Sequence, residues 1–326
     1  MRVLSFDVED GFHLLQHAPS RGHTPERRRA LRIESNIDRI LQALNNRGAK
    51  ATFFCLGWVA AQFPQVLRRI VANGHDVGSH SHLRRPTHEL GRKGFAADLH
   101  RSCASIANAT GQAVYLYRSP GFLRRHHLPW FYDVLAEQGI GADCSIHTAL
   151  SQPSPGLATF ATPYQVDLGS TRIMEFPVSA PKLLSWSAGP SGGNTFGLAP
   201  YALMRRHLRA SPYAMAYFRP PQLDTPSPAA AAPSWPQLFM GQVGLHRPWE
   251  KFLHLLSEFE FVSVSQAIKL TDWASAPVVQ WPQSGPPTSD FATLPPGQAP
   301  WPVSQPMGLR EPVRPRQAPR RSGSLL

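Results

Sequence analysis

Acidic and histidine side chains gather at two short stretches of this chain. Asp7, Glu9 and Asp10 stand within four residues at the end of an apolar run, and His80 and His82 follow another such run. Clustered carboxylates repel one another unless a cation or a shared proton relieves the repulsion. Imidazole and carboxylate groups together are typical ligands of zinc and related metals. The pattern predicts a catalytic metal site with one open position, at which a second Asp acts as general base on bound water.

These stretches lie in a chain whose strand-like and helix-like patterns alternate. Repeated strand–helix units require parallel strands joined by right-handed crossovers, so we predict an α/β fold, either a barrel or an open sheet. In both, functional side chains gather at the carboxyl ends of the strands. The predicted strands are residues 3–8, 51–56, 75–79, 113–117, 140–146, 172–178, 214–218 and 260–264. The predicted helices are residues 37–44, with Ser35 as cap, 59–70, 95–107, 128–138, 199–209 and 248–257.

Composition restricts the class of protein. The 326 residues are 42% hydrophobic and carry a formal charge of +12. Three cysteines are too few for a disulfide framework. The sequence also contains no run of about 20 apolar residues, the length that a membrane-spanning helix needs. The N-terminus lacks a signal-peptide pattern, so we expect a cytoplasmic protein. Positive charge alone identifies no partner, and the absence of a stripe of basic and aromatic residues argues against nucleic acid.

The chain changes character at Ser275. From there onward it contains 12 of the 33 prolines, and no apolar periodicity remains. Such a segment buries too little apolar surface to offset the loss of backbone entropy. We therefore predict one domain over residues 1–274 and a disordered Pro/Arg-rich tail over residues 275–326, which could bind an unidentified partner.

Four segments, residues 4–12, 51–59, 74–82 and 117–122, follow one another in the order of known motifs. They resemble the NodB-like polysaccharide deacetylases, carbohydrate esterase family four, above all the branch found with exopolysaccharide gene clusters. The similarity covers about residues 1–270. It implies a distorted parallel β/α barrel that removes N-acetyl groups from amino-sugar polymers by means of a divalent metal, usually zinc.

The resemblance also implies roles for single residues. Asp7 matches the catalytic base, and Arg118 matches the arginine that orients it. Asp10 and His80 match metal ligands, and Asp143 matches, less closely, the acid of a later motif. The residues predicted to contact the saccharide are Trp58, Arg84, Pro120, Gly121 and Phe122.

Two positions depart from the family pattern. The motif His-x-x-x-His has Arg84 in place of its second histidine, and Tyr-Phe-His-Pro has Arg219 in place of the general acid. A guanidinium stays protonated and offers no lone pair to a metal. His82 could supply the missing ligand if the backbone after His80 is extended, and His88 is a second, less favoured alternative. Glu9 stands beside Asp10 as an alternative ligand.

Two hypotheses therefore follow from the sequence. The first is a metal-dependent N-deacetylase acting on N-acetylated polysaccharide or its precursors, with Arg219 stabilising the oxyanion or the leaving group. The second is a catalytically impaired member that binds acidic saccharide in the former active-site cleft. In that case Arg84 and Arg219 form an anion site, since arginines hold carboxylates without a metal.

Overall fold

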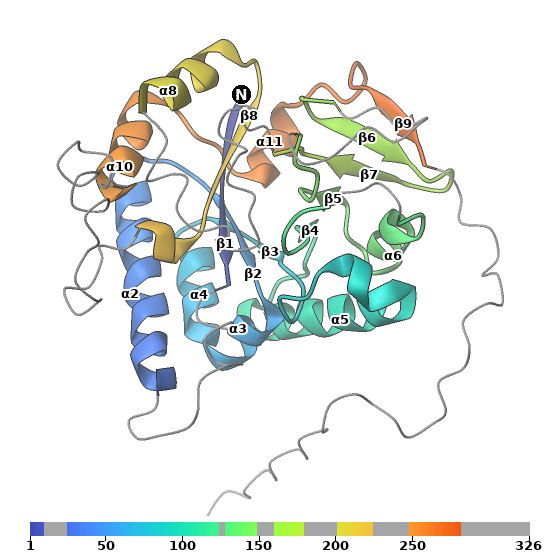
Figure 1. Cartoon of the computed structure of the whole chain (residues 1–326), viewed down its shortest axis with the longest axis horizontal. Helices are drawn as coiled ribbons and strands as arrows, with labels where there is room; N and C mark the ends of the chain where they lie inside the picture. Colours follow the sequence, from blue (N-terminus) through green and yellow to red (C-terminus); the bar gives the residue numbers. More distant parts are fainter. Residues whose placement is uncertain (10–24, 124–127, 149–159, 179–200, 224–247, 282–326) are drawn as a thin grey trace, which may run out of the picture. The chain divides into compact units, whose positions relative to one another are not determined.

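The computed structural model describes residues 1–9, 25–123, 128–148, 160–178, 201–223 and 248–281 (Figure 1). Its strands are β1 (Arg2–Val8), β2 (Thr52–Cys55), β3 (Asp76–Ser79), β4 (Leu116–Tyr117), β5 (Ala142–Asp143), β6 (Tyr164–Asp167), β7 (Arg172–Glu175), β8 (Ala214–Phe218) and β9 (Val278–Gln280). Its helices are α2 (Pro25–Asn45), α3 (Gly57–Gln62), α4 (Pro64–Ala72), α5 (Thr87–Thr110), α6 (Phe131–Glu137), α8 (Tyr201–Ala210), α10 (Pro248–Glu258), α11 (Val264–Leu270) and the 3-10 turn η2 (Pro220–Leu223). Among these described helices, none is long and apolar enough to span a bilayer.

The described strands form one sheet in the order β8-β1-β2-β3-β4-β5-β7-β6-β9. Neighbouring strands are parallel except for β6 and β7, which pair antiparallel. The predicted α/β fold with a mostly parallel sheet is thereby confirmed. Because parallel strands end at the same edge, the segments after β1, β3, β4 and β8 come together there.

Side chains on the two faces of the sheet enter two different apolar clusters. On one face Phe6 stacks on Phe53, with ring centroids 4.8 Å apart. On the other face Val3 and Phe54 belong to a smaller cluster. Successive side chains of a strand point to opposite faces. Asp7 therefore lies on the same face of β1 as Val3, above the smaller cluster.

The predicted helices are present with different bounds. Helix α2 begins at Pro25, well before Ser35, so Ser35 lies inside the helix, where its hydroxyl donates to the carbonyl of Arg32. The helix expected over residues 59–70 is divided into α3 and α4, because Phe63 leaves the helical conformation and Pro64 begins a new helix. Proline is well suited to a first helical turn, where its missing N–H has no intrahelical acceptor.

The strand predicted over residues 260–264 is wrong. The structure has a single bridge there, between Val262 and Val3, and then helix α11. Ser263 caps this helix: its hydroxyl accepts from the backbone N–H of Gln266, whose side chain accepts from the backbone N–H of Ser263. This reciprocal capping box fixes a helix start where apolar alternation alone indicates a strand.

The predicted domain boundary at residue 274 is also wrong. Strand β9 pairs with β6, and Trp281 packs edge-on against Tyr132 and donates a hydrogen bond to the carbonyl of Pro129 over 2.7 Å. The folded part therefore extends at least to Trp281, within a compact unit that spans Met1–Ser284. From residue 282 onward, the predicted disordered tail lies outside the described residues.

Candidate active site

The polar residues of the candidate site follow the carboxyl ends of adjacent strands. Asp7 is the sixth residue of β1 and Glu9 comes directly after that strand. Arg219 follows β8, His80 follows β3, and Arg118 follows β4. The ladder continues into these segments, since the N–H of His80 donates to the carbonyl of residue 55 and that of Arg118 to residue 79. Regular backbone pairing thus positions these side chains.

Asp7 and Arg118 form a buried ion pair. The Nη1 atom of Arg118 donates to Oδ1 of Asp7 over 2.8 Å, and the two side chains are 0% and 3% exposed. Arg118 also donates from Nε to the carbonyl of Cys144 and lies 4.2 Å from the ring centroid of Phe54. Burial alone would lower the pKa of Arg118, but the charge of Asp7 raises it above its usual value. The structure thus brings together the two residues that the sequence analysis predicts as base and orienting arginine.

Glu9 lies at the centre of a second ion cluster. Its Oε2 atom pairs with Nε of Arg84, and its Oε1 atom lies 2.5 Å from Nε of Arg219. His80 Nε2 is 3.6 Å from the same Oε2. Burial alone would raise the pKa of Glu9, but the nearby His80 side chain and the charges of Arg219 and Arg84 lower it to about 2. Arg84 and Arg219 thus hold one carboxylate between them.

His80 is oriented as a metal-binding histidine commonly is. Its Nδ1 atom lies 2.9 Å from the carbonyl oxygen of Arg118 and so acts as the donor, because a carbonyl only accepts. This hydrogen bond leaves Nε2 as the nitrogen that could hold a metal. In this structure, however, Nε2 faces the Glu9 carboxylate.

The described residues do not fit a divalent metal. No group of three His, Cys, Asp or Glu side chains in the described part of the chain could hold a metal ion. Two guanidinium groups occupy the surroundings of Glu9, and each would repel a dication. Asp10, which the sequence analysis assigned as a ligand, lies outside the described residues.

His82 lies against a different part of the molecule. A Cβ atom built on Gly57 would lie 2.6 Å from Nδ1 of His82 and 2.6 Å from the Cα of Ser102, so the ring packs where α3 meets α5. Burial, with the charge of Arg101, lowers the pKa of His82 to about 4. Its backbone N–H donates to Asp98 Oδ2 over 2.8 Å. The structure does not join His82 with Glu9 and His80 into a metal-binding group.

Asp143 lies beneath the site, fully buried. Its Oδ1 atom accepts from the hydroxyl of Ser145 over 2.6 Å, and that hydroxyl accepts from the N–H of Ser119. Burial raises the pKa of Asp143 to about 6. Burial and the charge of Asp143 raise the pKa of Glu175, its neighbour on β7, well above the usual range. Asp143 therefore supports the backbone next to Arg118.

The predicted saccharide-contacting loop forms one wall of the site. Pro120 is buried and Gly121 is exposed with a φ of +75°. Phe122 has a φ of +59°, which is uncommon for a bulky residue and often marks functional positions. Its ring lies 5.0 Å from that of Tyr217 and 5.1 Å from that of His147. Trp58, by contrast, lies at the start of α3 and packs against Phe63, which follows that helix.

Three contributions to this site were missed from the sequence. Glu9 was considered only as an alternative ligand, although its place two residues after Asp7 puts both side chains on one side of an extended segment. His147 and Tyr217 were assigned no role. His147 is 4% exposed, and burial lowers its pKa to about 4. Its position just after β5 is the signal that could have identified it.

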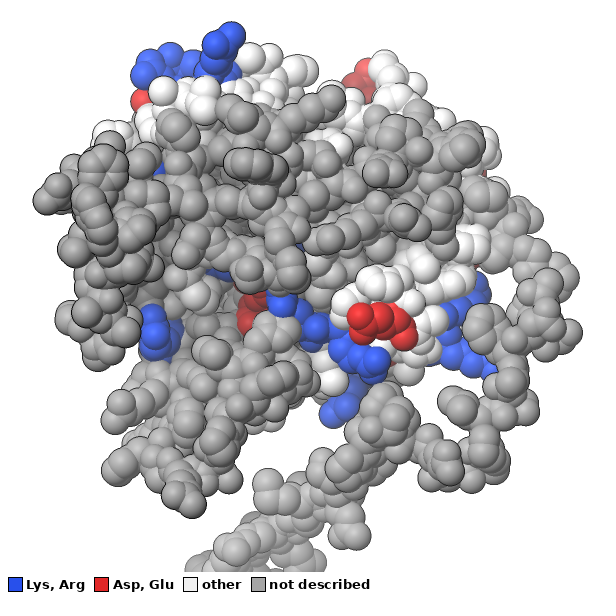
Figure 2. Space-filling view, viewed as in Figure 1, with Lys and Arg blue, Asp and Glu red and all other residues white. Residues whose placement is uncertain are grey.

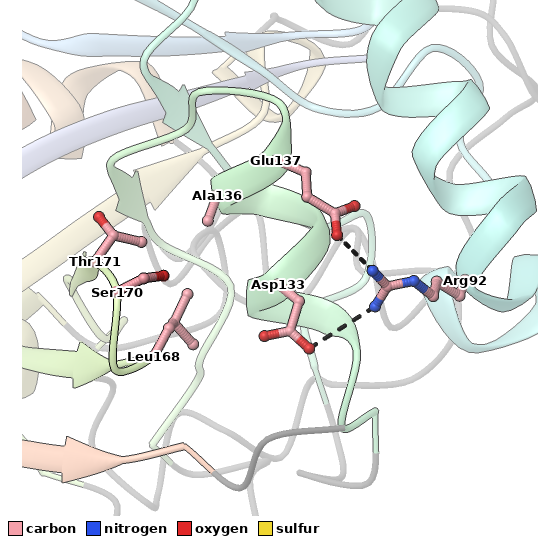
Figure 3. Close-up of a pocket in the computed structure, with 7 residues that line it drawn as sticks. All are labelled: Arg92, Asp133, Ala136, Glu137, Leu168, Ser170 and Thr171. Atoms are coloured by element: carbon pink, nitrogen blue, oxygen red, sulfur yellow. Dashed lines mark hydrogen bonds and ion pairs between the residues drawn. The ribbon is translucent and has the colours of Figure 1, made fainter. Parts of the chain in front are cut away.

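A cavity of about 480 Å³ lies elsewhere, beside α6 and the β6–β7 turn. Arg92 of α5 reaches across it to Asp133 and Glu137 (Figure 3). The cavity contains none of the residues at the strand ends, so we do not assign the site to it. Its lining residues are Arg92, Asp133, Ala136, Glu137, Leu168, Ser170 and Thr171.

Two family models match this chain in succession. Residues 24–142 match the model described as polysaccharide deacetylase. Residues 144–269 match a domain of unknown function, DUF3473. The second model is that of the exopolysaccharide-associated branch. Together the matches cover both sides of the candidate site, since Arg118 lies in the first and Arg219 in the second.

Characterised relatives and a solved structure are similar to this chain. A peptidoglycan-N-acetylglucosamine deacetylase of Bacillus cereus is 25% identical over 130 residues, covering 36% of this chain and 47% of the relative. A chitooligosaccharide deacetylase of Bradyrhizobium sp. is 30% identical over 112 residues, covering 33% and 47%. The matches thus cover about half the length of these relatives. A crystal structure from Mycobacterium smegmatis, assigned to the polysaccharide deacetylases, has the same fold with a TM-score of 0.59, 20% identity, and coverage of 82% of this chain and 88% of that one.

Proposed function

Since this chain carries a polysaccharide deacetylase domain, we propose that it binds an N-acetylated saccharide at the strand-end site without metal-dependent hydrolysis. The observation that carries this proposal is the Glu9 carboxylate held by Arg84 and Arg219. In the family pattern both arginine positions are histidines, one a metal ligand and the other a proton donor. An arginine replaces neither role, because it lacks a lone pair and keeps its proton.

Other parts of the site support binding of a sugar. Phe122 and Tyr217 bring two aromatic rings to the edge where Asp7 and Arg118 lie. Both aromatic residues are partly exposed. Aromatic rings beside fixed polar groups are suited to a saccharide, which has apolar ring faces and polar edges. We also propose that the protein is cytoplasmic.

Titration of chitotetraose, a neutral N-acetylglucosamine oligomer, into the full-length protein tests the proposal by calorimetry. We expect binding with the same affinity in EDTA and in zinc, and acetate release no faster than from the Asp7→Asn variant. Lack of binding under all conditions would overturn the proposal. So would acetate release that requires zinc.

Metal-dependent removal of N-acetyl groups is the second candidate function. It is favoured by one specific observation, the buried Asp7–Arg118 pair, which preserves the base and its orienting arginine. Arg219 would then stabilise the oxyanion or the leaving group. The same assay separates the candidates, because this function requires zinc-dependent acetate release that Asp7→Asn abolishes.

A further inference from the structure

Two buried acids lie side by side beneath the candidate site. Asp143 of β5 and Glu175 of β7 are paired residues on adjacent parallel strands, so their side chains point to the same face of the sheet. Both residues are 0% exposed. Among the described residues, no lysine or arginine forms an ion pair with either acid, and the buried Arg118 is paired with Asp7 instead. Two full negative charges at this depth would therefore repel each other without compensation.

The other titratable groups around the two acids are neutral. They belong to the strands and the helix that pack against the acids, and they are Tyr117 of β4, Tyr132 of α6, Cys144 after β5, Tyr164 of β6 and Tyr213 before β8. Burial raises the pKa of each of these groups, so all five keep their protons at neutral pH. None of the five supplies a positive charge to the two acids.

The hydrogen bonds around the two acids lack one proton. Oδ1 of Asp143 accepts from the hydroxyl of Ser145 over 2.6 Å. The two oxygens of Glu175 accept from the N–H of Ile146 and from the hydroxyl of Tyr132. Oδ2 of Asp143 is buried and has no hydrogen-bond partner within the described part of the chain. Three donors thus serve four carboxyl oxygens, and a proton held between the two acids would supply the fourth hydrogen bond.

Ser145 connects the two acids to the aromatic wall of the site. Its hydroxyl accepts from the N–H of Ser119 over 2.8 Å and donates its own proton to Asp143. Its carbonyl accepts from the N–H of Leu123 over 2.9 Å. The loop between these two residues, which contains Phe122, is therefore held at both ends by Ser145. A displacement of Asp143 would move both ends of this loop.

From this arrangement we infer that Asp143 and Glu175 share one proton at neutral pH, and that this shared proton positions the loop of residues 119–123 for binding. Glu175 is then a positioning residue that acts on the saccharide site through Asp143 and Ser145. The part that concerns binding rests on the proposed function, whereas the shared proton itself does not. Loss of the proton to solvent at alkaline pH leaves two negative charges, whose repulsion displaces Asp143.

Infrared spectroscopy of the full-length protein detects the shared proton. A protonated carboxyl has a carbonyl stretch that a carboxylate lacks, so we expect this band from the wild type at neutral pH. Glu175→Gln should remove one such carboxyl from the spectrum. Glu258→Gln is the matched control and should leave the band unchanged, because Glu258 pairs with Arg205 and Arg209 of α8, whose basic side chains lie at the top of Figure 2. A band that is absent from the wild type, or unchanged in Glu175→Gln, would overturn the inference.

The pH dependence of binding tests the positioning role. We expect the affinity for chitotetraose to fall about tenfold from neutral to alkaline pH, the size of effect that a hydrogen bond to a charged group provides. A glutamine side chain keeps a permanent N–H donor for Asp143, so Glu175→Gln should remove this fall. Glu175→Leu has no such donor and should bind weakly at both pH values, whereas Glu258→Gln should keep the wild-type fall. A fall that persists in Glu175→Gln would refute positioning by the proton.

Failure of this inference is distinguishable from failure of the proposed function. Burial and the charge of Asp143 raise the pKa of Glu175, so its stabilising contribution is lost as pH rises through that raised value. Urea unfolding should therefore show an alkaline loss of stability in the wild type that Glu175→Gln lacks, whether or not a saccharide binds. If chitotetraose binds but the infrared band and this loss are both absent, the inference is overturned and the proposed function stands. If both are present but chitotetraose binds at no pH, the proposed function and the positioning role are overturned and only the shared proton stands.

Discussion

At the scale of single residues, the site is governed by fixed charges, because two guanidinium groups hold one buried carboxylate. Glu9 is buried, yet it keeps its charge because three cationic or hydrogen-bonding groups surround it. A buried carboxylate in this situation depends on its partners, since removing one leaves uncompensated charge. Glu9 thus holds Arg84 and Arg219 in place, and protonation of its carboxylate would remove this interaction.

This leads to a prediction about acid unfolding. The pKa of Glu9, about 2, lies below its ordinary value of 4.5 because the nearby His80 side chain and the arginine charges outweigh burial. Such a carboxyl stabilises the fold above its unfolded pKa, and this contribution is lost as pH falls toward the folded value. We expect the free energy of unfolding to lose roughly 3 kcal/mol through Glu9 between about pH 5 and pH 2.

Urea unfolding at several pH values measures this loss. Glu9→Gln should flatten this part of the profile, whereas Asp38→Asn, which removes an exposed carboxylate on α2, should not. An unchanged pH profile in Glu9→Gln would show that the cluster does not hold the charge we assign to it.

At the scale of elements, the loop after β3 is positioned by the two helices that pack beneath it. Asp98 of α5 accepts hydrogen bonds from the N–H groups of His82 and Leu83. The N–H of Gly57, at the start of α3, donates to the carbonyl of Ser81. These hydrogen bonds fix the backbone of residues 81–83, between His80 and Arg84. The position of Arg84 therefore depends on α3 and α5.

A substitution at Gly57 tests this packing. A methyl group there would lie 2.6 Å from Nδ1 of His82 and from the Cα of Ser102, so backbone must move. We expect Gly57→Ala to lower the free energy of unfolding by about 1–3 kcal/mol, the usual cost of overpacking. Gly94→Ala in α5 is the matched control, because its nearest neighbour is Leu90 Cβ at an ordinary 3.5 Å. Chemical denaturation compares the two variants, and equal stability would refute the packing argument.

The sequence predicts the elements well where local signals agree with the fold. Apolar runs correctly indicated β1, β2, β3 and β8. The structure brings the polar residues after these strands to one edge of the sheet, and their role as a functional site stays a prediction. The pairing of Glu9 with Arg84 and Arg219 could not be predicted, because it joins segments far apart in the chain. The sequence does not predict β9, because three residues among prolines carry little periodicity. It indicates a strand where α11 begins, because apolar alternation there competes with the capping box.

At the scale of the whole molecule, the folded part includes residues 275–281, which composition assigned to the tail. Val278–Gln280 adds a strand to β6, and Trp281 covers Tyr132 and Pro129 near α6. These contacts join sequence-distant parts of the sheet. The tail predicted from composition therefore starts too early.

Two truncations test this boundary. A chain ending at Ala274 loses β9 and Trp281, so we expect it to unfold at a lower denaturant concentration, with a loss of about 3–5 kcal/mol from the large buried ring. A chain ending at Ser284 keeps every described contact and serves as the matched control. Equal unfolding midpoints for both truncations would contradict this boundary.

The metal content of the full-length protein tests the central claim most directly. The protein is dialysed against zinc at neutral pH, then against metal-free buffer, and its zinc is measured by mass spectrometry. Our account predicts far less than one zinc per chain, equally for the wild type and for His80→Ala. One retained zinc per chain that is lost in His80→Ala, but kept when the exposed His88 is changed to alanine, would contradict it.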